Sequence, residues 1–216
     1  MNAFSLYFQM SILIVFSTLV AGRIIHLRHK YKTNALSIIR NKGIQRFLGI
    51  TVVTIINVWV AILLVYILHP EIEFLPFPLD LVLVDIIPVK IVGILLICLG
   101  LVIYISAWVA LSNAWRIGYD REPKGDLIRK GIYRISRNPM YLFYDLYFVG
   151  TFMINGDLIF LLLAVLLIIA LHYLIIQEEK SLDLTHGESF RTYACQTSRY
   201  LSWRVLSSMT LFRNKD

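Results

Sequence analysis

Five apolar runs, separated by polar or basic segments, dominate the pattern of the sequence. The runs are Phe4–Ala21, Phe47–Leu68, Ile91–Leu111, Met140–Ile154 and Leu158–Ile176. A membrane-spanning helix needs roughly 20 apolar residues, and every run except the fourth meets that length. The fourth would be a helix of about 22 Å at 1.5 Å per residue. The pattern predicts an all-α integral membrane protein with about five transmembrane helices, the first of them retained rather than cleaved as a signal.

The last two runs are separated only by Asn155-Gly156-Asp157, a strong turn signal. Pro139 precedes the fourth run, so its start is also marked. We therefore expect these two spans to form a tight helical hairpin. The segment Phe74–Val89 is apolar but interrupted by prolines and aspartates, and we expect it to lie at the extracytoplasmic membrane interface.

Basic residues alternate between the connecting segments. Lys and Arg are absent from residues 1–22 and 155–157, and one occurs in 69–90, but seven occur in 23–46, seven in 113–138 and six in 177–216. Basic loops stay in the cytoplasm, so the N-terminus should be outside and the C-terminus cytoplasmic. We expect residues 1–112 to hold three spans and a basic cytoplasmic loop, and 113–216 to form the catalytic region: a cytoplasmic loop, the hairpin and a cytoplasmic tail.

Composition supports a membrane protein, because 58% of the 216 residues are hydrophobic and only 16% are charged. Soluble domains average about 45–50% apolar and about 25% charged residues. Inward-facing loops beside anionic lipid explain the net charge of +7, so we expect membrane lipids rather than nucleic acid as partners. The two cysteines are far apart and the histidines scattered, which predicts neither a disulfide nor a metal site. Dinucleotide-binding and P-loop glycine motifs are absent as well.

The start of the fourth run could bind an anion. Asn138 is a good N-cap residue, and Pro139 suits the first helical position. Free N–H groups at a helix N-terminus attract anions, and Arg134 and Arg137 add positive charge. Ordinary capping beside snorkelling arginines explains the same residues equally well.

Three acidic residues and a histidine lie in or beside the hairpin. We expect the fifth helix to continue to Gly187 as its C-cap, which puts Glu178 and Glu179 mid-helix at headgroup level. One of them could accept hydrogen bonds from a ribose diol or pair with an ammonium group; the alternative is a solvated acidic face. Asp145 shares a helix face with Tyr141, and a structural partner is as good an explanation for it, or for His172, as a functional role.

Taken together, these stretches resemble the isoprenylcysteine carboxyl methyltransferases and their phospholipid N-methyltransferase relatives. The family signature, Arg-His-Pro-x-Tyr followed some tens of residues later by Glu-Glu, reads Arg-Asn-Pro-Met-Tyr at 137–141 and Glu-Glu at 178–179. Trp115–Gly118 and Leu127–Tyr133 fit the approach to the signature, and Tyr193 and Arg199 fit the tail. The resemblance covers roughly residues 106–200.

The resemblance implies S-adenosylmethionine bound among the cytoplasmic ends of the last two spans, with a lipophilic or amphiphilic acceptor entering from the bilayer. The acceptor would be an isoprenylcysteine carboxylate or a lipid amine, and the protein would suit a bacterial inner membrane. The implied cofactor contacts are Leu127, Ile128, Tyr133, Asn138, Pro139, Met140, Tyr141, Glu178 and Glu179. The expected catalytic residues are Arg137, Asn138 and Tyr141, and the expected substrate contacts are Asp145, His172 and Arg199.

The sequence departs from the family at several positions. Asn138 replaces the histidine of the signature, and Leu174 stands where the eukaryotic carboxyl methyltransferases place a substrate-holding arginine. Arg137 or Arg199 could substitute for that arginine. Two other functions remain open: an NADPH-dependent membrane reductase of related architecture, which would need free basic side chains for the extra phosphate, and a non-enzymatic membrane protein.

Overall fold

The computed structural model describes residues 3–31, 44–69, 75–111 and 127–201. These residues form six α-helices and one short 3-10 helix. In chain order the elements are α1 (Ala3–Tyr31), α2 (Ile44–Leu68), α3 (Ile87–Leu111), η3 (Gly131–Arg134), α4 (Pro139–Asn155), α5 (Leu158–His186) and α6 (Glu188–Gln196). The prediction of an all-helical protein is confirmed for this part of the chain, whose β structure is limited to an isolated bridge between Val82 and Asp157.

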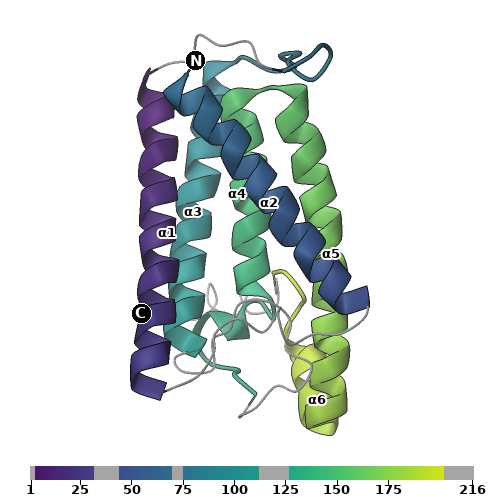
Figure 1. The fold of residues 1–216 in the computed structure, drawn as a ribbon. Coiled ribbons are helices and arrows are strands. Elements are labelled where there is room, and N and C mark those ends of the chain that lie inside the picture. Colours follow the sequence, from purple (N-terminus) through teal and green to yellow (C-terminus); the bar gives the residue numbers. More distant parts are fainter. Residues whose placement is uncertain (1–2, 32–43, 70–74, 112–126, 202–216) are drawn as a thin grey trace, which may run out of the picture.

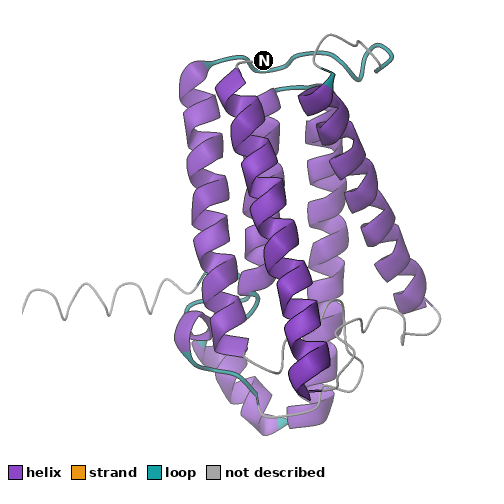
Figure 2. Ribbon diagram, turned by 60° about the vertical axis from the view of Figure 1, so that its left-hand side comes forward, coloured by secondary structure: helices purple, strands orange, loops and turns teal. Residues whose placement is uncertain are grey.

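The long helices form an elongated bundle (Figure 1). Helices α1, α3, α4 and α5 run alongside one another, and α2 crosses obliquely in front of α4 and α5. The α4–α5 turn and the segment 75–86 lie at one end of the bundle, which we call the turn end. Helix α6 and η3 lie at the other, which we call the α6 end. Figure 2 shows that the connecting segments gather at these two ends.

Within the described part of the chain, three helices are long and apolar enough to cross a membrane: Gly49–Leu68 of α2, all of α3, and all of α5. At most 33% of the most apolar stretch of each is buried within the protein. Their remaining apolar side chains face outwards; Val102, for example, is 62% exposed. Water would oppose so much exposed apolar surface, whereas lipid accepts it. The chain is therefore an all-helical membrane protein.

Helices α3 and α4 pack unusually closely through glycines. An ideal Cβ on Gly150 would lie 2.7 Å from the Gly93 carbonyl oxygen and 2.6 Å from Ile97 Cγ1. Small residues let membrane helices bring their backbones together. The buried face of α3 repeats with alternating steps of four and three residues, through Gly93, Ile97, Gly100, Tyr104 and Ala107. That spacing fixes which side of α3 receives α4.

Aromatic and amide side chains join the other helices to this pair. Trp59 of α2 is fully buried and packs edge-on against Phe148 of α4 and Phe160 of α5. Near the turn end, the buried Gln9 of α1 and Asn155 of α4 exchange hydrogen bonds of 3.3 and 3.0 Å between their amides. Each amide therefore satisfies the other inside an apolar bundle.

The α4–α5 turn is as tight as the sequence predicts. Gly156 adopts a left-handed conformation with φ of 83°, which ends α4. The Leu83 N–H donates to the Gly156 carbonyl at 2.8 Å, and the Leu158 N–H donates to the Leu81 carbonyl at 2.9 Å. The segment expected at the membrane interface thus folds across the turn and is held there by backbone hydrogen bonds.

Candidate functional site

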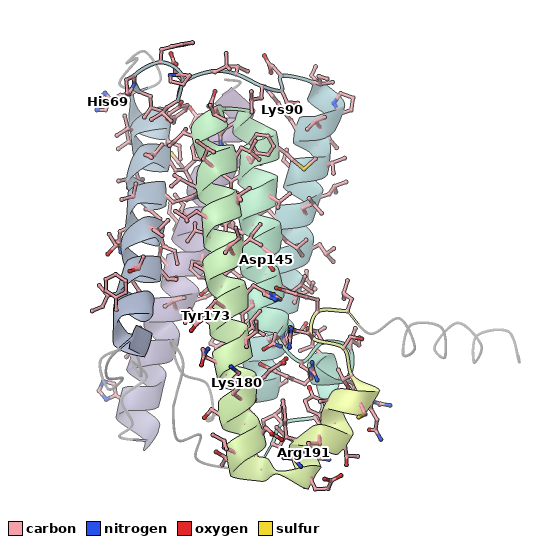
Figure 3. All side chains as sticks on the ribbon, turned by 90° about the vertical axis from the view of Figure 1, so that its right-hand side faces the viewer. His69, Lys90, Asp145, Tyr173, Lys180 and Arg191 are labelled. Carbon is pink, nitrogen blue, oxygen red and sulfur yellow. The ribbon has the colours of Figure 1, made fainter. Side chains whose placement is uncertain are left out.

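The α6 end brings together segments that are far apart in the sequence. The start of α4, the last turns of α5, the helix α6 and residues 197–201 meet there (Figure 1). The Arg137 N–H donates to the Ser198 carbonyl at 3.0 Å, and the Tyr193 hydroxyl donates to the Tyr133 carbonyl at 2.6 Å. Figure 3 shows the polar side chains that gather in this region.

Helix α4 begins at Pro139 with Asn138 in the N-cap position, as predicted, but the Asn138 side chain makes no capping bond. The expectation of a side-chain cap is therefore wrong. Instead Nδ2 donates to Glu179 Oε1 at 3.0 Å and to the Arg199 carbonyl at 3.3 Å. A charge-assisted bond to a buried carboxylate is stronger than a neutral cap, and this explains why the amide turns towards α5.

Glu179 is the centre of a buried polar cluster. Its residue is only 8% exposed. Arg199 approaches Oε2 with Nη2 at 2.7 Å and Nε at 3.1 Å, and Arg137 Nη2 lies 3.2 Å from Oε1. With Asn138, three donor side chains thus surround one carboxylate. The hydrogen bond to Glu179 raises the pKa of Arg199. The cluster ties α5 to the start of α4 and to the tail.

Glu178 points elsewhere, as expected for the neighbour of Glu179 on a helix. Its Oε2 accepts a hydrogen bond of 2.9 Å from the hydroxyl of Tyr141. Both acids are mid-helix, because α5 runs to His186 and ends at Gly187 with φ of 52°, as predicted. The two halves of the signature, 137–141 and 178–179, therefore meet through two separate contacts.

The approach to the signature also packs here. Tyr133 in η3 is buried, and burial first, then the charge of Glu178, raises the pKa of its phenol well above 10.0. Leu127 and Ile128 are half-buried at the start of this described stretch. The motif residues 115–118 lie outside the described residues.

The remaining expected cofactor contacts, in the first turn of α4, point in different directions. Pro139 is buried, whereas Met140 packs in an apolar group with Val20 and Trp108. Met140 therefore faces α1 and α3, while Tyr141 faces Glu178.

The three expected substrate residues do not form one group. His172 Nδ1 lies 2.9 Å from the hydroxyl of Tyr200, and the two rings stack with centroids 5.9 Å apart. Asp145 lies near the middle of α4 (Figure 3), whereas Arg199 belongs to the Glu179 cluster. Tyr200 and Ser136 were not predicted: the Ser136 hydroxyl accepts from the Asn138 N–H at 3.1 Å. The only sequence signal for Tyr200 was its position directly after Arg199, which the family resemblance had already singled out.

A comparison with models of protein families finds a match to this chain. Residues 89–189 match the phospholipid methyltransferase family model. The resemblance read from the sequence is therefore confirmed for this stretch, which contains α3, η3, α4, α5 and the first residues of α6. Methyltransferase activity at a membrane is the general class that this phospholipid methyltransferase match implies. A comparison with curated proteins finds no match.

Proposed function

We propose that this protein transfers a methyl group from S-adenosylmethionine to a lipophilic or amphiphilic acceptor, an isoprenylcysteine-like carboxylate or a lipid amine. The observation that carries the proposal is the hydrogen bond between Tyr141 and Glu178. It joins the two halves of a methyltransferase signature at the N-terminus of a membrane helix, inside the stretch that matches the family model.

The chemistry of the residues at the α6 end fits the proposed cofactor. N–H groups in the first turn of α4 lack partners within the helix and suit the methionyl carboxylate. Glu178, which is half-buried, suits the ribose hydroxyls or the ammonium group, and Tyr133 and Tyr141 suit a cation. Leu127, Ile128 and Pro139 would supply apolar contacts. When bound, the cofactor supplies an already activated methyl group, so the task of the protein is positioning and exclusion of water.

The Glu179 cluster changes the roles proposed for its members. Arg137 and Asn138 bind Glu179 with their side chains, so we assign them and Glu179 to holding α4, α5 and the tail in register. Of the three residues expected to be catalytic, Arg137, Asn138 and Tyr141, only Tyr141 directs its polar group towards Glu178. Tyr141 therefore remains the proposed catalytic residue. Met140 would contribute only its backbone.

The proposed topology is five spans, with α1 and α4 crossing alongside the three long apolar helices. The alternation of basic segments favours an N-terminus outside and a site facing the cytoplasm, as in a multi-pass protein of a bacterial inner membrane. Residues 1–112 would then anchor the protein, and residues 113–216 would carry the chemistry.

A reductase would need cationic side chains for the extra phosphate of NADPH. Of the arginines at 134 and 137 that leave this alternative open, Arg137 is engaged by Glu179, as is Arg199, whereas Arg134 is exposed. This pairing favours the methyltransferase over the reductase. A non-enzymatic role would leave the contact between the two signature halves without a purpose.

Calorimetry with the purified full-length protein tests the proposal. Wild type should bind S-adenosylhomocysteine and not NADPH. Glu178→Gln removes a charged hydrogen-bond acceptor, worth about 1.5–3 kcal/mol, and should weaken binding by about 10–100-fold. Tyr141→Phe should weaken it less.

Matched controls are Glu188→Gln, an exposed acid in α6, and Tyr144→Phe, a neighbouring phenol in α4. Neither should change the affinity. If wild type binds no S-adenosylhomocysteine, the proposed function is wrong; if it binds NADPH instead, the reductase takes its place.

A further inference from the structure

Asp145 is an acid in an apolar part of the bundle. Its Oδ1 atom is buried and makes no hydrogen bond. Residues 49–68 of α2 and 91–111 of α3 contain no charged side chain or histidine. In Figure 3 Asp145 lies about midway along the bundle, away from Lys180 and Arg191 towards the α6 end, and the residue is half-buried. Buried polar atoms normally have partners, so this oxygen requires an explanation.

The register of α4 against α5 identifies the neighbours of Asp145. The two helices are antiparallel, and Asn138 contacts Glu179. Seven residues, or about two turns, further into each helix lie Asp145 and His172. Tyr200, which pairs with His172, bridges the two levels, because Arg199 beside it binds Glu179.

Electrostatics agrees with this placement. Burial raises the pKa of the Tyr200 phenol, and the charge of Asp145 is the next largest cause. Tyr200 of the tail is therefore a titratable neighbour of Asp145. The register of the two helices puts His172 at the same level of α5, and Tyr141 and Tyr144 are the neighbours of Asp145 along α4. Arg199 is already paired with Glu179, and no described side chain donates a hydrogen bond to Asp145 Oδ1.

Asp145 is also next to the proposed reaction site. It lies one helical turn after Tyr141, on the same face of α4. Tyr141 contacts Glu178 on the side towards the α6 end. An acceptor that enters from the bilayer interior would meet Asp145 before it reached Tyr141.

We propose that Asp145 binds the reacting group of the methyl acceptor, and that this group donates a hydrogen bond to Oδ1, as an amine or a hydroxyl does and a carboxylate does not. The inference rests on the proposed function and narrows its acceptor. An ionised carboxylate has no proton to donate to Oδ1, and Arg137 and Arg199, the nearby arginines that could bind it, both contact Glu179 instead. His172 and Tyr200 form the wall beside Asp145.

The test compares three probes with the same chain length: dodecylamine, dodecanol and dodecanoate. Their binding to the purified full-length protein in micelles is measured with S-adenosylhomocysteine present. Wild type should bind the amine and the alcohol at least tenfold more tightly than dodecanoate. Asp145→Leu should weaken the amine and the alcohol at least tenfold, and Asp145→Asn should weaken the amine much more than the alcohol.

Asp183→Asn is the matched control, because it removes the same charge from a more exposed position on α5. It leaves the contribution of micelle partitioning unchanged and should alter no affinity. Both Asp145 variants should still bind S-adenosylhomocysteine, which verifies that they are folded. If Asp145→Leu loses this binding, the test uses Asp145→Asn alone.

Dodecanoate binding to wild type as tightly as dodecylamine would overturn the inference. So would an amine affinity that stays within twofold of wild type in a folded Asp145 variant. Failure of the proposed function gives a different result: wild type would then bind no S-adenosylhomocysteine, while the contrast between amine and carboxylate could still be measured without it.

Discussion

The two ends of the α4–α5 hairpin are held together in different ways. At the turn end the contacts are mostly backbone: Gly156 occupies a left-handed conformation, and residues 79–84 donate and accept main-chain hydrogen bonds across it. At the α6 end the contacts are mostly side chain, with Glu179 joining Arg137, Asn138 and Arg199 from two other segments.

This difference suggests that the turn end fixes the geometry of the hairpin and that the α6 end carries the functional site. Backbone contacts around a three-residue turn fix the angle and register of the two helices, whatever their side chains. The α6 end inherits that register and adds a cluster that depends on particular charges. A binding site needs specific side chains held from several segments, and only the α6 end provides them.

The largest effect should come from Glu179→Ala, which breaks the α6 end. Removing one partner of a buried ion pair costs about 3–5 kcal/mol because the remaining charge is left unpaired. Partial exposure of Arg199 puts the expected loss near the lower limit. Thermal unfolding should show a drop of roughly 6–12 °C, at about 2–4 °C per kcal/mol, together with loss of S-adenosylhomocysteine binding.

Glu179→Gln keeps the hydrogen-bonding shape without the charge and should lie between wild type and Glu179→Ala. A melting temperature unchanged in Glu179→Ala would mean that the cluster does not hold the α6 end together.

Gly156→Ala breaks the turn end and should be second in size. An ideal Cβ there would lie 1.9 Å from the Val84 carbonyl oxygen, so residues 79–84 would have to move. A left-handed alanine costs about 1–2 kcal/mol, and each lost hydrogen bond adds about 0.5–1.5 kcal/mol. Thermal unfolding of the purified protein measures the sum.

Gly187→Ala is the matched control for this change. Gly187 also has a positive φ, of 52°, although its ψ of −125° differs from that of Gly156, and a Cβ there would meet nothing within 4 Å. It should lose only the backbone contribution. Equal losses at the two glycines would contradict the role assigned to the packing of residues 79–84 against the turn.

The elements of the fold were readable from the sequence because apolar runs and turn residues act locally. Pro139, Gly156 and Gly187 mark helix boundaries through their own backbone preferences, and the structure has those boundaries. The α3–α4 interface was missed, although Gly93, Gly100 and Ala107 recur every seven residues. Small residues at this spacing were the available signal.

The site was only partly readable, because its contacts join residues about 20 to 60 positions apart. The signature predicted that Tyr141 and Glu178 belong together, but not that Asn138 would leave its cap for Glu179. A single residue favours a cap through local geometry. The stronger partner of Asn138 is Glu179 of α5, and α5 and the tail come close to Asn138 only in the complete fold.

Asp157 makes the turn end sensitive to pH. Burial raises its pKa to about 6 from 3.8, although a hydrogen bond from Tyr66 acts in the opposite direction. A raised folded-state pKa means that the stabilising contribution is complete below about 3.8 and is lost as the pH rises through about 6. The difference corresponds to at most about 3 kcal/mol at neutral pH.

Asp157→Asn should remove this loss, since it resembles the protonated acid. Melting temperatures measured from pH 4 to pH 8 should fall more steeply for wild type than for the variant. Parallel curves would mean that Asp157 is ionised as easily in the folded protein as in the unfolded chain.

The smallest effect should come from the Gln9–Asn155 pair, which links α1 to the turn end through side-chain hydrogen bonds. Hydrogen bonds between membrane helices are worth about 0.6 kcal/mol on average, because the unfolded chain in the membrane also finds partners. A double-mutant cycle of Gln9→Leu and Asn155→Leu should give a coupling of that order, measured by thermal unfolding. A coupling of several kcal/mol would put side chains in control of the turn end as well, and the contrast between the two ends of the hairpin would then disappear.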